Sequence, residues 1–120
     1  MRTIIALTML LVMLTVPAHA KLKTIGQVDH QEFDQSSFPP KMKEAYSLMK
    51  SKCLVCHTME RTVMAVTTGI APISSTVFDK SAARAYCNKM LKKPNANMSK
   101  QDVKIIVDLL NYLLDQTAIY

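Results

Sequence analysis

Apolar residues recur at helical spacing in two separate stretches of the chain. In the first, an apolar set follows at intervals of three or four residues, the spacing of one face of an amphipathic helix: Met42, Tyr46, Met49 and Cys53. Pro40 precedes this set, and proline suits the first turn of a helix. The second stretch lies near the C-terminus, where a stripe is thickened by two neighbours: Val103, Val107, Leu110 and Leu114, with Ile106 and Leu113. Each stretch predicts one helix.

The start of the C-terminal helix has its own sequence signature. Ser99 and Asp102 are three residues apart and resemble a capping box, in which each side chain bonds the backbone N–H of the other residue. Met98 before the cap and Val103 four residues after it would form a hydrophobic staple. We expect this helix to begin directly after Ser99.

A third helix is expected between these two. Asp79 or Ser81 would cap it, and it would run to about Lys92, with Pro94 to stop it. Residues 58–77 look less regular, because they are rich in Thr, Val, Ile and Ser and contain a glycine and a proline. No strand pattern or internal repeat emerges, so the patterns predict an all-α fold with about three main helices.

Residues 1–20 differ from the rest of the chain. Arg2 supplies a positive charge, residues 3–16 are almost wholly apolar, and small residues surround the end of the segment. These are the three parts of a secretory signal peptide. We therefore expect cleavage between Ala20 and Lys21 and export to the periplasm. The apolar run is too short for a comfortable membrane span and no later stretch is long enough, so no span is expected after cleavage.

The remainder divides into a polar lead-in, residues 21–38, and a domain, residues 39–120. We expect the lead-in to be loosely ordered. We expect the domain to need a source of stability beyond its hydrophobic core, because small domains bury a low fraction of their surface and the chain has no Trp. The chain has three Cys, an odd number, which argues against paired disulfides as the source of that stability. A bound cofactor is the better candidate.

The charge of the chain does not point to nucleic acid. The formal net charge is +6 and falls by one when Arg2 is removed. Lys residues are scattered, and no aromatic stacking platform runs between them. A group of them could instead steer an acidic protein partner toward the domain: Lys52, Lys89, Lys92 and Lys93.

Cys53, Cys56 and His57 form a C-x-x-C-H sequence, the attachment signature for c-type haem. At the end of a helix, two Cys three apart can reach the two vinyl-derived carbons on one side of a porphyrin, and each forms a thioether. His57 then points its imidazole at the iron from one axial side. A redox dithiol would need a βαβ context, and zinc usually takes four ligands, for which the mature chain adds only Cys87 and His30. One covalently bound haem c is therefore the expected cofactor.

The chain resembles the class I-type monohaem cytochromes c of bacterial periplasms from about Lys41 to Gln116. The shared features are a helix that runs into C-x-x-C-H, an Arg four residues past the His (Arg61), a helix that ends in Met90, and a Ser-capped last helix. The resemblance implies a cytochrome c-like fold wrapped around the haem, with His57 and Met90 as the axial ligands of the iron. The residues alone leave the sixth position open among several candidates: Met90, Met98, Met64, His30 and no protein ligand.

These features predict an electron-transfer protein rather than an enzyme. A six-coordinate iron leaves no place for a substrate, so the chain would pass single electrons between a reductase or dehydrogenase and an acceptor. Two alternatives remain. A labile or vacant sixth position would give a gas sensor or a peroxidase-like enzyme, and docking through residues 21–38 would give a fixed cytochrome subunit of a larger dehydrogenase. Cys87 is expected to be a buried core residue.

Overall fold

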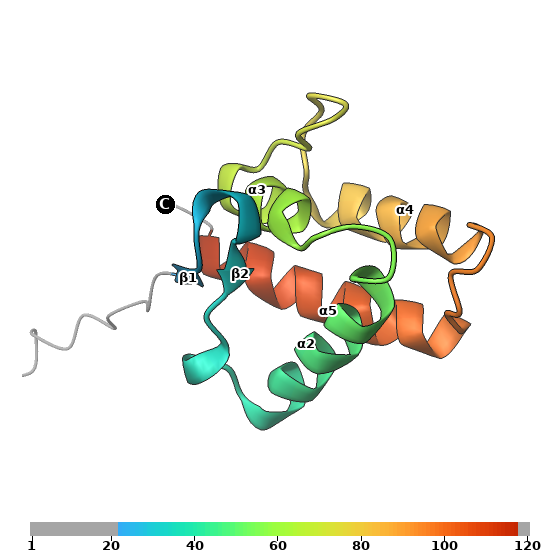
Figure 1. The fold of residues 1–120 in the computed structure, drawn as a ribbon, viewed down its shortest axis with the longest axis horizontal. Helices are drawn as coiled ribbons and strands as arrows, with labels where there is room; N and C mark the ends of the chain where they lie inside the picture. The colour runs from blue at the N-terminus through green and yellow to red at the C-terminus, as the bar shows by residue number, and fades with distance from the viewer. Residues whose placement is uncertain (1–21, 118–120) are drawn as a thin grey trace, which may run out of the picture.

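The computed structural model describes residues 22–117, which form four α-helices and a two-stranded hairpin (Figure 1). In chain order the elements are β1 (Thr24–Ile25), the 3-10 helix η2 (Val28–His30), β2 (Glu32–Phe33), the 3-10 helix η3 (Gln35–Ser37), α2 (Pro40–Cys53), α3 (Glu60–Thr68), α4 (Lys80–Leu91) and α5 (Lys100–Thr117). The expected signal peptide, residues 1–20, lies outside the described residues. Between residues 22 and 117, no helix has both the length and the apolar character that a bilayer crossing requires.

The C-terminal helix α5 is the centre of the fold. It packs against α2, α3 and α4, and Figure 1 shows it running through the middle of the molecule. Its buried face contains five of the six residues of the predicted stripe together with Leu109, which is fully buried, whereas Leu114 of the stripe is only partly buried. The predicted capping box is confirmed, because Ser99 Oγ accepts from the N–H of Asp102 over 3.0 Å and Asp102 Oδ2 accepts from the N–H of Ser99 over 2.8 Å.

The predictions for α2 and α4 are also confirmed. Helix α2 begins with Pro40 and ends at Cys53, and its core-facing side includes Tyr46 and Met49. Helix α4 is capped by Asp79, whose Oδ1 accepts from the N–H of Ala82 over 2.8 Å. This bond satisfies one of the backbone donors that are left over at a helix N-terminus.

The prediction of about three main helices is wrong by one. Residues 58–77, expected to be irregular, contain the nine-residue helix α3. One face of this helix is buried against the core: Thr62, Val63, Ala65 and Val66. Tertiary burial of that face outweighs the weak helix propensity of Thr and Val. Gly69 ends α3 in the left-handed conformation at φ 71°, which glycine adopts without steric cost.

The lead-in is more ordered than expected, and it makes the fold mostly rather than entirely helical. Strands β1 and β2 pair antiparallel, with Thr24 opposite Phe33. Phe33 and Phe38 are buried, and both rings meet Tyr46 of α2 edge-on at centroid distances of 6.0 Å. The lead-in therefore completes the same core as α2 and α5.

Candidate functional site

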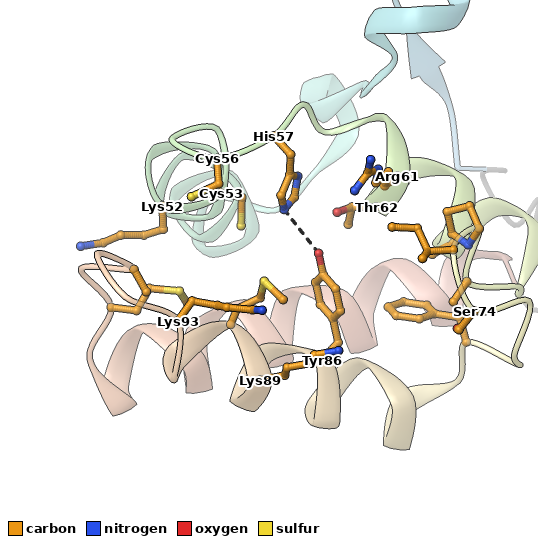
Figure 2. Close-up of a pocket in the computed structure, with 18 of the residues that line it drawn as sticks. Lys52, Cys53, Cys56, His57, Arg61, Thr62, Ser74, Tyr86, Lys89 and Lys93 are labelled. Carbon is orange, nitrogen blue, oxygen red and sulfur yellow. Dashed lines mark hydrogen bonds between the residues drawn. The ribbon is translucent and has the colours of Figure 1, made fainter.

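A cavity of about 580 Å³ opens beside the turn that follows α2 (Figure 2). Its walls come from the end of α2, the first half of α3, the loop between α3 and α4, the second half of α4, and the loop between α4 and α5. The lining is largely apolar, with Ala65, Ile73 and Phe78 among its residues. This volume is in the range of pockets that hold organic cofactors and drug-sized ligands, roughly 300–1,000 Å³.

All three residues of the C-x-x-C-H sequence line this cavity. Cys53 is the last residue of α2 and is half-buried, whereas Cys56 lies in the following turn and is exposed. The turn is tight, because the N–H groups of Cys56 and His57 both approach the carbonyl oxygen of Cys53 at 3.4 Å. The chain's three cysteines are free thiols, so Cys53 and Cys56 are available for reaction with a ligand in the cavity.

The imidazole of His57 is held in one tautomer. Its Nδ1 lies 2.9 Å from the carbonyl oxygen of Thr58, and because a carbonyl only accepts hydrogen bonds, Nδ1 carries the proton. In the neutral imidazole the lone pair is then on Nε2, which lies 3.5 Å from the hydroxyl of Tyr86. It points toward the α4 side of the cavity, as Figure 2 shows. A backbone carbonyl that orients the remote nitrogen in this way is the usual support for a metal-binding histidine.

The structure separates the candidates for a second iron ligand. Met90, on the last turn of α4, and Met98, in the loop before α5, both line the cavity. Met64 lies on the exposed side of α3, and His30 is exposed in η2; neither of them lines it. The cavity therefore gathers His57 with two thioethers.

Tyr86 of α4 also lines the cavity, and the sequence analysis did not identify it as a site residue. Its hydroxyl lies 3.5 Å from Nε2 of His57, and its ring packs edge-on against Phe78 at 6.3 Å. Burial raises the pKa of Tyr86 above its usual value, so the side chain is a neutral phenol that can donate to Nε2. Tyr86 precedes Met90 by four residues, a spacing that places both on one face of α4.

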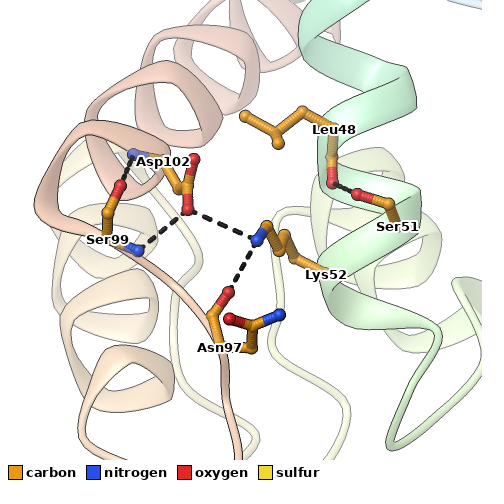
Figure 3. A network of polar contacts seen from close by, with 6 residues as sticks. All are labelled: Leu48, Ser51, Lys52, Asn97, Ser99 and Asp102. Carbon is orange, nitrogen blue, oxygen red and sulfur yellow. Dashed lines mark hydrogen bonds and ion pairs between the residues drawn. The ribbon is translucent and has the colours of Figure 1, made fainter.

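Basic side chains surround the cavity: Lys52, Arg61, Lys89 and Lys93. Lys52 differs from the others because it is tied into a polar network (Figure 3). Its ammonium donates to the carbonyl oxygen of Asn97 over 2.7 Å and lies 3.6 Å from Asp102 Oδ2. The network joins the end of α2 to the start of α5 and fixes the loop that carries Met98.

The thiols of the site and of the core have different surroundings. Burial raises the pKa of the Cys53 thiol, and the nearby Cys56 adds to this effect. Cys87 is buried in the core, as expected, and burial raises its pKa to about 12. Cys87 does not line the cavity.

The two alternatives to haem find little support in the surroundings of the cysteines. A thioredoxin-type dithiol requires a βαβ unit, whereas the sheet in residues 22–117 is one short antiparallel hairpin. Zinc usually takes four ligands, and no group of three or more His, Cys, Asp or Glu side chains in the described part of the chain could hold a metal ion.

No protein-family model, curated protein or solved structure matches the chain.

Proposed function

We propose that the chain is an exported electron-transfer protein that carries one covalently bound haem c in this cavity. The observation that supports the proposal most directly is the convergence of Cys53, Cys56 and His57, whose Nδ1 lies beside the carbonyl oxygen of Thr58, on one apolar cavity of about 580 Å³. Haem c supplies one-electron Fe(II)/Fe(III) chemistry when bound.

Each residue of the site has a distinct part in this proposal. Cys53 and Cys56 form the thioethers, and His57 binds iron through Nε2 while Thr58 holds the ring in place. Met90 supplies a thioether ligand, a soft donor that raises the reduction potential relative to a second histidine. The apolar lining keeps water away and acts in the same direction.

The surface beside the cysteines suits brief contact with a redox partner. Leu54 and Val55, between the two cysteines, are 44% and 72% exposed. Lys89 and Lys93 stand on the rim of the same cavity. An apolar edge with lysines around it favours an acidic protein partner and fast, salt-sensitive association.

The alternative of a fixed subunit docked through residues 21–38 has less support. The described part of that segment is packed on its own domain, with Phe33 and Phe38 buried against Tyr46. The rings of Phe33 and Phe38 are therefore not available to a partner, although Ile25 and Val28 of the same segment are exposed.

The proposal is tested by expressing the full chain in a bacterium that has a cytochrome c maturation system. The exported product should begin at Lys21 and carry one haem that survives denaturation and acid–acetone extraction. The variants C53S and C56S should each lose one thioether, and the double variant should be colourless. The matched control is C87A, which removes the remaining thiol of the chain outside the cavity and should keep the haem. A colourless wild-type product would overturn the proposal.

The rate of carbon monoxide binding distinguishes an electron carrier from the gas sensor of the alternative function. A carrier with two protein ligands should bind carbon monoxide slowly in its reduced form. Rapid and complete binding would instead favour a sensor or a peroxidase-like enzyme.

A further inference from the structure

The chain carries no charged residue between Arg61 and Asp79, although charged residues make up 20% of its sequence. This uncharged segment includes most of α3 and residues 69–78, the apolar loop, which Figure 1 shows projecting from the body of the molecule between α3 and α4. Four of the eight large apolar side chains that are exposed in the described part of the chain lie in the segment: Met64, Ile70, Ile73 and Val77. Exposed apolar side chains that gather in this way mark an interaction site.

The apolar loop is a short hairpin. Two backbone hydrogen bonds, of 2.7 and 2.8 Å, flank an antiparallel bridge between Ile70 and Val77, so these two side chains lie opposite each other on one face. Ile73 lies in the turn between them and is 74% exposed. The hydroxyls of Ser74 and Thr76 bond each other over 2.7 Å. These bonds lower the cost of removing the loop from water, because polar groups without partners are expensive to bury.

Basic side chains flank the apolar loop. Arg61 precedes the uncharged segment, Lys80 and Arg84 follow it on α4, and all three are exposed. Lys80 pairs with Asp115 over 2.7 Å, whereas Arg61 and Arg84 make no ion pair among residues 22–117. The carboxylate of Asp79, at the other end of the segment, is engaged in the helix cap. Two unpaired guanidinium groups beside an apolar loop are complementary to a surface with negative charge outside and hydrocarbon beneath.

We propose that the apolar loop docks the protein on the surface of an anionic lipid bilayer. The side chains of Ile70, Ile73 and Val77 enter the headgroup region, and Arg61 and Arg84 lie close to lipid phosphates. This inference goes beyond the proposed function and does not require haem. Because Ile73 also lines the cavity, docking holds one wall of the cavity next to the bilayer.

A bilayer fits the apolar loop better than a protein partner does. A stable protein–protein interface takes roughly 20–30 residues from each side, whereas the loop is only ten residues long. Reversible binding to a membrane surface needs less, because a few apolar side chains and nearby basic groups both contribute to it.

The test measures how much of the purified product of the full chain sediments with lipid vesicles at low ionic strength. Vesicles of phosphatidylglycerol and phosphatidylcholine in equal parts should bind the wild type more strongly than vesicles of phosphatidylcholine alone. I73S/V77S should bind the anionic vesicles at least about tenfold more weakly, because two apolar side chains no longer leave water. The matched control I25S/V28S changes two exposed side chains of the lead-in and should bind like the wild type.

The basic flanks and the site of contact are tested separately. R61Q/R84Q should bind the anionic vesicles more weakly than K41Q/K43Q, which has the same net charge but changes two lysines of α2. Amide hydrogen exchange of the wild type needs no variant. Anionic vesicles should slow the exchange of residues 70–77 and leave that of residues 25–30 unchanged.

Two results would overturn the proposal. A wild type that stays in solution with both kinds of vesicle would exclude the bilayer and favour a protein partner for the apolar loop. Equal binding by the wild type and I73S/V77S would mean that net charge, rather than the loop, attracts the protein to the vesicles. Gel electrophoresis measures the protein in each fraction, so a colourless product would overturn the haem proposal and leave this test unchanged.

Discussion

The hydroxyl of Tyr46 accepts a hydrogen bond from the backbone N–H of Phe33 over 3.0 Å, in a buried position. This bond joins the lead-in to helix α2. The N–H of Asp34 bonds the carbonyl oxygen of Lys23, so Thr24 and Phe33 form a non-hydrogen-bonded pair and the N–H of Phe33 points away from β1. Y46F leaves the donor buried without a partner, which costs about 1–3 kcal/mol. Urea denaturation should show this loss of stability. Amide hydrogen exchange at Phe33 should also become faster.

The control for this variant is Y112F, which removes a hydroxyl from another tyrosine that packs edge-on against Phe38. We expect Y112F to unfold within about 0.5 kcal/mol of the wild type. Equal destabilisation by Y46F and Y112F would show that the aromatic contacts, rather than the hydrogen bond, determine the effect.

Tyr46 also makes the stability of the domain depend on pH in the alkaline range. Burial raises the pKa of Tyr46 from 10.0 to about 12, so the folded chain keeps the phenolic proton at a pH where the unfolded chain has lost it. Stability from this group is complete below pH 10 and decreases as the pH rises from 10 to about 12, by roughly 3 kcal/mol in total. Unfolding free energies measured between pH 8 and about 12 should decrease less steeply in Y46F than in the wild type. Parallel curves would contradict the assignment.

The helices that could be predicted from the sequence are those with a periodic apolar face and a local start signal. The capping box of Ser99 and Asp102 and the cap at Asp79 are local in sequence, and both occur as expected. Helix α3 has neither advantage. Its N-cap position, Met59, makes no side-chain cap bond, and its β-branched residues favour strands when they are considered alone. Burial against α5 stabilises it, and that contact is not visible in the sequence.

The residues of the candidate site also fall into two groups, those that the sequence identifies and one that only the fold brings to the cavity. Cys53, Cys56 and His57 are neighbours in the chain, so their common chemistry could be identified from spacing alone. Tyr86 is 29 residues from His57, and only the packing of α4 against α5 brings it to the cavity. The signal that could have identified it is its i, i+4 relation to Met90, because both residues then lie on one face of the helix.

The network around Lys52 gives a prediction about the wall of the site. K52M removes the ammonium that bonds the carbonyl oxygen of Asn97 and lies near Asp102, while the methionine keeps most of the apolar stem. We expect a loss of about 1 kcal/mol, because the bond is charge-assisted but partly exposed to water. Amide exchange at Met98 should become faster. K92M is the control, since Lys92 is exposed and makes no ion pair among the described residues.

Asp102, which belongs to the same network, makes the stability of the domain depend on pH in the acid range. The hydrogen bond from the backbone of Ser99 lowers the pKa of Asp102 below 3.8, and the charge of Lys52 adds to this effect. The stabilising contribution of the carboxylate is therefore present above pH 4 and is lost as the pH falls through the lowered pKa. Unfolding curves of D102N should lack this part of the acid dependence, and an unchanged profile would show that other carboxylates account for it.

The lysines of the cavity rim should control how fast the protein exchanges electrons with an acidic surface. Lys89 and Lys93 line the cavity, whereas Lys41 and Lys43 lie on the exposed side of α2 and do not. A gold electrode coated with a carboxylate-terminated monolayer serves as the probe. Voltammetry should show slower electron exchange for K89Q/K93Q than for K41Q/K43Q, which carries the same net charge. The difference should shrink as the ionic strength approaches about 1 M, where the screening length is only about 3 Å. Equal rates in the two double variants would mean that overall charge, rather than the basic rim, guides the approach.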